Sequence, residues 1–150
     1  MHYNDLISSA ASEISSLNVK IILPRASILD GLQILVIDDC PDNQFLFSRL
    51  LTRRGAIVTL ASDGQAGVDL ALSKKFDFVM MDIQMPIMDG YAAMEHLKTV
   101  GYAVPVVAVT ASSHVEEKIK IMSSGFSNQV TKPVNIENLI EIIQNLTQEK

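Results

Sequence analysis

The segment DFVMMDIQMPIMDG, residues 77–90, holds one strand-like run and the start of one helix-like run. Residues 77–82 form a short apolar run rich in Met and Val, which is typical of a strand buried on both faces of a parallel sheet. Helical spacing begins at Gly90 and continues to about residue 100, where Gly101 ends it. The segment therefore predicts a strand, a loop and a helix in that order.

The same order of strand and helix recurs on both sides of this segment. Further strand-like runs cover residues 33–38, 56–61, 106–110 and, more weakly, 129–131. Helical spacing covers about residues 41–55, 64–74, 113–124 and 136–146. Five consecutive βα units predict a doubly wound α/β domain. Ligands of such domains bind beyond the carboxyl ends of the strands, so residues at these ends are the candidates for a site.

The composition is that of one acidic globular domain. The chain has 150 residues, of which 48% are hydrophobic, too many for a disordered protein. A formal net charge of −5 argues against direct nucleic-acid binding, which uses basic surfaces. No apolar run approaches the roughly 20 residues that span a bilayer, and we expect neither a membrane segment nor a secretion signal. With Cys40 as the single cysteine, no internal disulfide can form, and a cytoplasmic location fits.

The first 30 residues differ from the repeating pattern. Residues 6–17 have weak helical spacing, and residues 19–23 look like a strand closed by Pro24. This piece is too short to be a second domain. We therefore expect residues 1–30 to be an extension or linker and residues 31–150 to be the domain. The extension either packs on the domain or is the end of a larger protein.

Five polar residues fall at the carboxyl ends of the predicted strands. Asp38 and Asp39 close the first strand, Asp82 the third and Thr110 the fourth, and Lys132 follows the fifth. Carboxylates gathered at one edge repel one another, and a hard divalent cation such as Mg²⁺ removes the repulsion. An ammonium and a hydroxyl beside them suit a phosphoryl group in transfer, and a central carboxylate can be its nucleophile.

Taken singly, these residues have simpler interpretations. An acidic pair after a strand is often a helix cap or part of a solvated loop, and one Thr or one Lys-Pro pair indicates almost nothing. The hypothesis of a site rests on their joint placement, in order, on successive strands.

Four motifs resemble those of the CheY-like receiver domains of response regulators and hybrid histidine kinases. They are ILVIDDCPDNQ (34–44), MMDIQMPIMDG (80–90), VVAVTA (106–111) and VTKPV (130–134). The resemblance covers residues 32 to about 147. It implies a flavodoxin-like three-layer fold with five parallel strands in the order 2-1-3-4-5.

The resemblance also implies which residues carry the chemistry. Asp82 would be the phosphoacceptor. Asp38, Asp39 and Asp82, with the backbone carbonyl of Gln84, would hold Mg²⁺. Thr110 would bond a phosphoryl oxygen and report phosphorylation to the neighbouring loops.

The resemblance places the remaining site residues on the fifth strand and the loop after it. Lys132 would bridge to the carboxylate or the phosphoryl group, and the Lys132–Pro133 peptide bond would be cis. One position departs from the family pattern, because receivers usually carry Tyr or Phe where this chain has Gln129, while Phe126 is out of register. Transfer to Asp82 should survive this change, but the usual coupling between Thr and aromatic ring, and the output surface it controls, are in doubt.

The resemblance implies a phosphoacceptor signalling domain and not an enzyme. Its donor would be a histidine kinase or a histidine phosphotransfer protein, and phosphorylation would change a surface that binds a downstream partner, which the sequence does not identify. The strand-like VKIILP (19–24) favours the C-terminal part of a hybrid kinase, with a stand-alone regulator as the alternative.

Two other functions remain open. A receiver-like module that binds a partner without phosphorylation is supported by Gln129 alone. An aspartate-nucleophile phosphohydrolase would usually have two Asp residues separated by one residue after the first strand, whereas Asp38 and Asp39 are adjacent.

Overall fold

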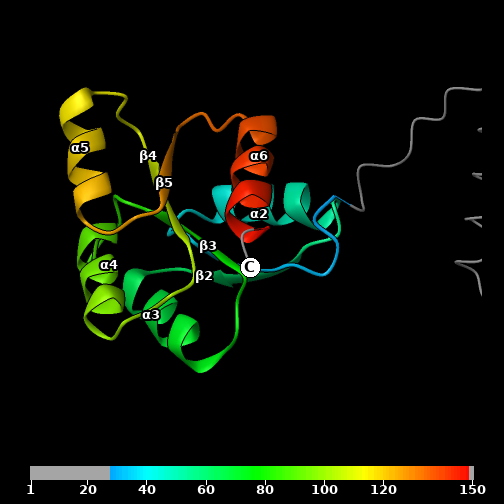
Figure 1. Ribbon diagram of the computed structural model, residues 1–150, viewed down its shortest axis with the longest axis horizontal. Coiled ribbons are helices and arrows are strands. Elements are labelled where there is room, and N and C mark those ends of the chain that lie inside the picture. Colours follow the sequence, from blue (N-terminus) through cyan, green and yellow to red (C-terminus); the bar gives the residue numbers. More distant parts are fainter. Residues whose placement is uncertain (1–27, 149–150) are drawn as a thin grey trace, which may run out of the picture.

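The computed structural model describes residues 28–148, in which strands and helices alternate five times (Figure 1). The strands are β1 (Gln33–Ile37), β2 (Ile57–Ala61), β3 (Phe78–Asp82), β4 (Val106–Thr110) and β5 (Asn128–Thr131). The helices are α2 (Pro41–Thr52), α3 (Gly64–Ser73), α4 (Gly90–Thr99), α5 (Val115–Ser123) and α6 (Ile136–Thr147). The predicted elements are all present, with ends that differ by at most three residues. The predictions for residues 1–27 fall outside the described part of the chain.

The five strands form one parallel sheet in the order β2-β1-β3-β4-β5. Strand β1 lies between β2 and β3, and Ile37 of β1 is opposite Met81 of β3. The residues that follow β1 and β3 therefore lie next to each other at the carboxyl edge of the sheet. The doubly wound fold and its strand order are confirmed.

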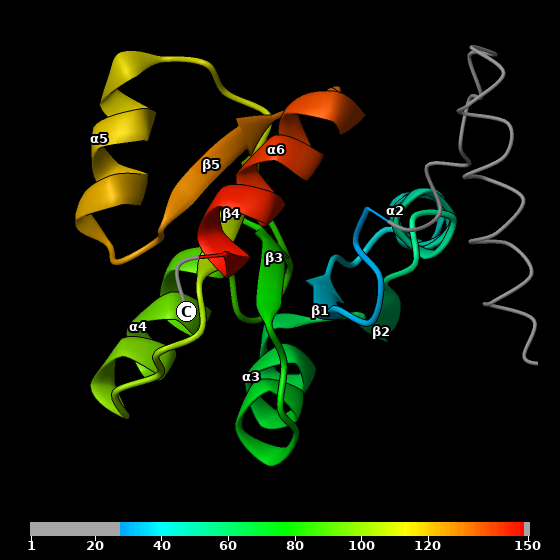
Figure 2. The same cartoon turned by 45° about the vertical axis from the view of Figure 1, so that its right-hand side comes forward.

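Helices cover both faces of the sheet. Helices α3, α4 and α5 lie on one face, and α2 and α6 lie on the other (Figures 1 and 2). Alternate residues of β1 enter the two cores, since Leu35 and Ile37 face the first group of helices and Ile34 and Val36 face the second. Burial on both faces explains why the central strands β1, β3 and β4 read as continuous apolar runs instead of alternating patterns.

Short side chains fix the points at which the helices begin. Asp63, Asp89 and Asn135 are N-caps of α3, α4 and α6, and each accepts a hydrogen bond from the backbone N–H three residues further on. Helix α2 has no such side-chain cap and begins with Pro41, which needs no N–H partner. Each of these helices therefore begins directly after a loop at the carboxyl edge of the sheet.

The core extends to the residues just before β1. The Leu29 side chain is 0% exposed and packs in the core between the sheet and helices α2 and α6. Its N–H donates to the Arg54 carbonyl at 2.8 Å, and the Gly31 N–H donates to the Gly55 carbonyl at 3.0 Å. Leu29, which the predicted division assigns to the extension, thus contributes to the packing of the domain. Between residues 28 and 148, no helix combines the length and apolar character needed to cross a membrane.

Candidate functional site

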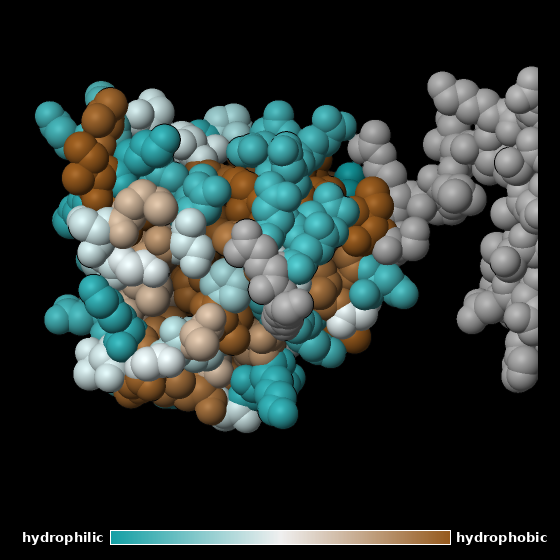
Figure 3. All heavy atoms as spheres, in the orientation of Figure 1, coloured by the Kyte–Doolittle hydropathy of each residue, from teal (hydrophilic) through white to brown (hydrophobic). Residues whose placement is uncertain are grey.

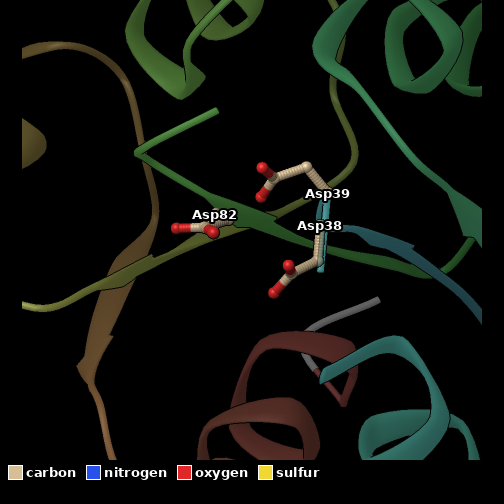
Figure 4. Close-up of side chains that lie close together, drawn as sticks. All are labelled: Asp38, Asp39 and Asp82. Atoms are coloured by element: carbon tan, nitrogen blue, oxygen red, sulfur yellow. The ribbon is translucent and has the colours of Figure 1, made fainter. Parts of the chain in front are cut away.

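Three carboxylates meet where β1 and β3 end (Figure 4). Asp38 and Asp39 follow β1 directly, and Asp82 is the last residue of β3. One oxygen from each of the three side chains lies within 4.8 Å of the other two. Asp38 is 2% exposed and Asp82 is 4% exposed, whereas Asp39 is open to solvent. The structure therefore brings together the three carboxylates that the strand ends predicted.

The first turn of α2 holds Asp38 in place. The Cys40 N–H donates to Asp38 Oδ1 at 2.8 Å, and Asn43 Nδ2 donates to Asp38 Oδ2 at 3.3 Å. Gln44 Nε2 donates to the Asp38 backbone carbonyl and to Ser62 Oγ. Sequence reasoning missed Asn43 and Gln44, although two carboxamides in the turn after an acidic pair are a signal that points to them. A carboxylate has about four acceptor positions, so Asp38 can still bind a cation.

The Asp82 carboxylate is held between the Lys132 ammonium and the backbone N–H of Gln84. Lys132 Nζ lies 3.1 Å from Asp82 Oδ2, and the Gln84 N–H donates to Asp82 Oδ1 at 3.2 Å. Burial raises the pKa of Asp82 above its ordinary value; the Lys132 ammonium opposes this effect, and the charge of Asp38 adds to it. The buried carboxylate is therefore costly to ionise unless a further positive charge joins the site.

Thr110 and Lys132 come to the same edge from the other half of the sheet. Thr110 is 3% exposed and pairs with Thr131, and the Lys132 N–H donates to the Thr110 carbonyl at 2.7 Å. The Thr110 hydroxyl oxygen accepts a hydrogen bond from the Ser112 N–H at 3.1 Å. The peptide bond between Lys132 and Pro133 is cis. The Lys132 ammonium thus reaches Asp82 from the end of β5, and the Thr110 hydroxyl lies at the end of β4 on the same edge of the sheet.

The donor set fits a hard divalent cation. Three carboxylates and one ammonium, when all are ionised, sum to −3 + 1 = −2 formal charges. Mg²⁺ prefers oxygen ligands and uses few carboxylates, with waters and phosphate oxygens in its remaining positions. Asp38, Asp39 and Asp82 would hold such an ion, and its charge would balance the excess. The part of the Gln84 carbonyl as a fourth protein ligand stays a prediction.

Gln129 lies in the edge strand β5, opposite Ala108. Its Oε1 atom is buried and has no hydrogen-bond partner among residues 28–148. Phe126, three residues earlier, is 3% exposed and meets the Tyr91 ring edge-on, with ring centroids 6.4 Å apart. The aromatic contact near β5 is therefore made by Phe126 with a residue of α4, and not by position 129.

Tyr91, the second residue of α4, joins this helix to helix α5. Its hydroxyl donates to Glu117 Oε1 at 2.5 Å, and Lys120 Nζ lies 4.2 Å from the centroid of its ring. Burial and the neighbouring Glu117 raise the pKa of Tyr91, so the hydroxyl remains a proton donor. Tyr91 directly follows Gly90, whose N–H donates to the Ile83 carbonyl at 2.8 Å. Sequence reasoning missed this link because its two residues are far apart in the chain.

Comparison with known proteins identifies a family and several relatives. The family model described as "Response regulator receiver domain" matches residues 34–144. "Hybrid signal transduction histidine kinase I" of Dictyostelium discoideum is 38% identical over 120 residues, which cover 74% of this chain and 7% of that kinase. The chain thus spans a small part of the length of this relative.

Solved structures of receiver domains superpose on the chain. The receiver domain of the sensor histidine kinase PA1611 from Pseudomonas aeruginosa, solved with a magnesium ion coordinated in its active site cleft, has a TM-score of 0.74 at 30% identity; the match covers 79% of this chain and 99% of that one. A co-crystal of the Saccharomyces cerevisiae histidine phosphotransfer protein Ypd1 with the receiver domain of the response regulator Ssk1 gives a TM-score of 0.75 at 25% identity, covering 79% and 90%.

Proposed function

Because the chain belongs to the response regulator receiver domain family, we propose that it accepts a phosphoryl group on Asp82 in a reaction that requires Mg²⁺. The observation that carries this proposal is the contact of Lys132 Nζ with Asp82 Oδ2 at 3.1 Å, inside a cluster of three carboxylates within 4.8 Å of one another. A lone acidic cluster has many explanations. The Lys132 ammonium, which comes from the end of the edge strand β5, gives the Asp82 carboxylate a partner suited to phosphate chemistry.

The proposed reaction moves one phosphoryl group from nitrogen to oxygen. An Asp82 carboxylate oxygen forms a bond to phosphorus while the P–N bond to a donor imidazole breaks. The electron pair of that bond returns to the imidazole nitrogen, which takes up a proton from solvent. Lys132 and the Thr110 hydroxyl donate hydrogen bonds to the phosphoryl oxygens. Mg²⁺, when bound by Asp38, Asp39 and Asp82, supplies positive charge to those oxygens, and catalysis is mainly positioning and charge neutralisation.

A phosphohistidine on a histidine kinase or a histidine phosphotransfer protein is the proposed donor. Support comes from the co-crystallised relative, whose partner is such a phosphotransfer protein, and from the kinase relatives in which receiver-like segments occur. We further propose that the chain is the C-terminal part of a hybrid kinase that works in the cytoplasm. The identity to segments of hybrid and sensor kinases supports this origin.

The surface around α5 is the proposed output. Val115, Ile119 and Met122 are 70%, 62% and 43% exposed and recur every three or four residues, so they form one apolar stripe on α5. The space-filling view shows brown, hydrophobic spheres over this helix (Figure 3). Phosphorylation would shift the population of α5 positions, which requires the phosphoryl group to favour one of them. A partner would then bind the stripe, together with neighbouring parts of β5 and α6.

A receiver-like module that binds its partner without phosphorylation is the second candidate. The observation that favours it is the buried, unpartnered Oε1 of Gln129 at the position where receivers usually carry the aromatic ring. A polar group in that position argues for different coupling between the site and α5. The first candidate requires a phosphoryl group on Asp82 and the second does not, so one measurement separates them.

That measurement is phosphorylation by a small acyl phosphate. The wild type and the Asp82→Asn variant are incubated with acetyl phosphate and Mg²⁺, and the intact mass of each is recorded. Asp69→Asn, an exposed carboxylate on α3, is the matched control. We expect one phosphoryl group on the wild type and the control, none on Asp82→Asn, and none when EDTA is added first. If the wild type gains no phosphoryl group, the proposal is refuted and the phosphorylation-independent module takes its place.

A further inference from the structure

The loop between β3 and α4 presents one apolar side chain entirely to solvent. Ile87 is 100% exposed, more than any other large hydrophobic residue in the described part of the chain. It also has a φ of +71°, and no other non-glycine residue between 28 and 148 has a positive φ. Exposure of an isoleucine and a left-handed backbone at a β-branched residue are each unfavourable in the free protein.

The backbone at Ile87 forms a tight turn. The Met88 N–H donates to the Pro86 carbonyl at 2.7 Å, which closes a three-residue turn with Ile87 at its centre. Turns of this size with a positive φ at the centre are the rarer and more strained form. Glycine or asparagine would adopt the same backbone with less strain, so neither the fold nor the turn explains the presence of an isoleucine.

The flanks of the loop hold this turn in place. A Cβ atom on Gly64 would lie only 2.5 Å from the Met88 carbonyl oxygen, so the start of α3 and the loop are in close contact. Asp89 caps α4 by accepting from the Ala92 N–H at 2.9 Å. A strained backbone conformation persists where the packing of the surrounding residues holds it, and such residues concentrate at functional sites. The Ile87 side chain is therefore held outward before any partner arrives.

The turn belongs to the same loop as the proposed acceptor. The loop begins at Asp82, whose Oδ1 accepts the Gln84 N–H, and closes where the Gly90 N–H donates to the Ile83 carbonyl at 2.8 Å. Asp82 is only 4% exposed, and a reacting phosphorus atom must come within about 3–3.5 Å of its oxygen. A protein that delivers a phosphoryl group to Asp82 must therefore cover the carboxyl edge of the sheet, from which this loop projects.

We propose that Ile87 is a docking residue for the phosphodonor protein and selects among donors. The partner surface that it fits carries a phosphohistidine with apolar side chains beside it, which bury Ile87 while the imidazole reaches Asp82. This inference rests on the proposed function. Burial in the complex would offset the exposure of Ile87 in the free protein, and the rigid turn limits the entropy lost on binding.

The test compares a protein donor with a small donor. The protein donor is Ypd1 phosphorylated on its histidine, and the small donor is acetyl phosphate, which needs no contact with the loop. The variants are Ile87→Asn, which removes the apolar side chain but tolerates the backbone, and Ile87→Leu, which keeps an apolar side chain. Leu72→Asn on α3 is the control, because Leu72 is also an exposed apolar residue, at 48%, outside the loop.

We expect Ile87→Asn to lower the second-order rate constant for transfer from Ypd1 about tenfold, equivalent to about 1.4 kcal/mol. Ile87→Leu and Leu72→Asn should retain most of the wild-type rate. Labelling by acetyl phosphate should be unchanged in all variants, and the urea midpoint of Ile87→Asn should equal or exceed that of the wild type because strain is relieved.

Three results would overturn the inference. Equal transfer from Ypd1 to the wild type and Ile87→Asn would show that the side chain makes no productive contact. Equal loss with both donors would show that Ile87 shapes the site instead of binding a partner. Labelling of the wild type by acetyl phosphate without any transfer from Ypd1 would exclude a histidine phosphotransfer surface as the occupant. Failure of acetyl phosphate itself would refute the proposed function, which separates the two conclusions.

Discussion

Replacement of Gly90 by alanine should lower stability and disable the site, although helix propensity predicts a gain in stability. Gly90 is the first residue of α4, and alanine is the better helix former by at most the roughly 0.5–1 kcal/mol that it gains in the middle of a helix. A Cβ atom at this position would lie 2.7 Å from the Asp82 carbonyl oxygen and 2.8 Å from the Ile83 Cα atom. Both are backbone atoms, which cannot rotate away as the end of a side chain can. The helix would have to move from the strand that carries the proposed acceptor.

The cost can be estimated from the contacts that must change. Overpacking of a tight contact costs about 1–3 kcal/mol. The hydrogen bond from the Gly90 N–H to the Ile83 carbonyl, now 2.8 Å, would lengthen, and such a bond contributes about 0.5–1.5 kcal/mol. After subtraction of the propensity gain, the free energy of unfolding should fall by about 1–3 kcal/mol. For a domain of this size, that corresponds to a fall in Tm of about 4–12 °C.

The control for this prediction is Gly101→Ala. Gly101 has a φ of +75° and no atom within 4 Å of the position of an added Cβ, so alanine there suffers backbone strain without a clash. This strain costs about 1–2 kcal/mol, similar to the loss expected for Gly90→Ala. Thermal unfolding and labelling by acetyl phosphate are measured for both variants. We expect both to be destabilised and only Gly90→Ala to label slowly. If Gly90→Ala is as stable as the wild type and labels normally, the prediction made from the close approach of α4 to Asp82 is refuted.

The remaining predictions concern charge at the site and the link to α5. Lys132→Met should slow labelling by acetyl phosphate at least tenfold, about 1.4 kcal/mol, yet tighten Mg²⁺ binding in calorimetry because a positive charge 3.1 Å from Asp82 is removed; weaker binding would contradict the electrostatic argument. Tyr91→Phe should lower the free energy of unfolding by about 1 kcal/mol through loss of the bond to Glu117. Tyr102→Phe should be neutral or stabilising in urea unfolding, because the Tyr102 hydroxyl is buried with no hydrogen-bond partner among residues 28–148. Equal effects of the two Tyr→Phe changes would refute the role of the Tyr91 link.

The alternation of strands and helices was predictable because the central strands β1, β3 and β4 are buried on both faces. Such strands read as short apolar runs, and the cap residues that follow them, Asp63 and Asn135 among them, mark where helices begin. Strand ends were less certain, since pairing in the sheet decides them: Asp38 was expected inside the first strand but lies just beyond Ile37. The strand order came from the family resemblance, because periodicity within one strand does not identify its neighbours.

The candidate site was predictable only to the extent that strand ends define it. Asp38, Asp82 and Lys132 stand at such ends, so the topology of the sheet brings them together. The contact between Tyr91 and Glu117 joins two helices, and helical spacing does not predict which side chains of two helices meet. The unpartnered oxygen of Gln129 depends likewise on how α5 covers β5, which the sequence pattern leaves open.

The loop after β3 shows why a departure from local rules can be informative. Gly90 must approach the Asp82 and Ile83 backbones closely, and Gly64 must approach Met88, so both flanks of the turn are fixed by packing. With its flanks fixed, the residue between Pro86 and Met88 projects into solvent whatever its identity. Folding therefore places no demand for an apolar side chain at position 87, and the strain of a positive φ disfavours a β-branched one. The physical cost of Ile87 in the free protein is best explained by a contact that the free protein lacks.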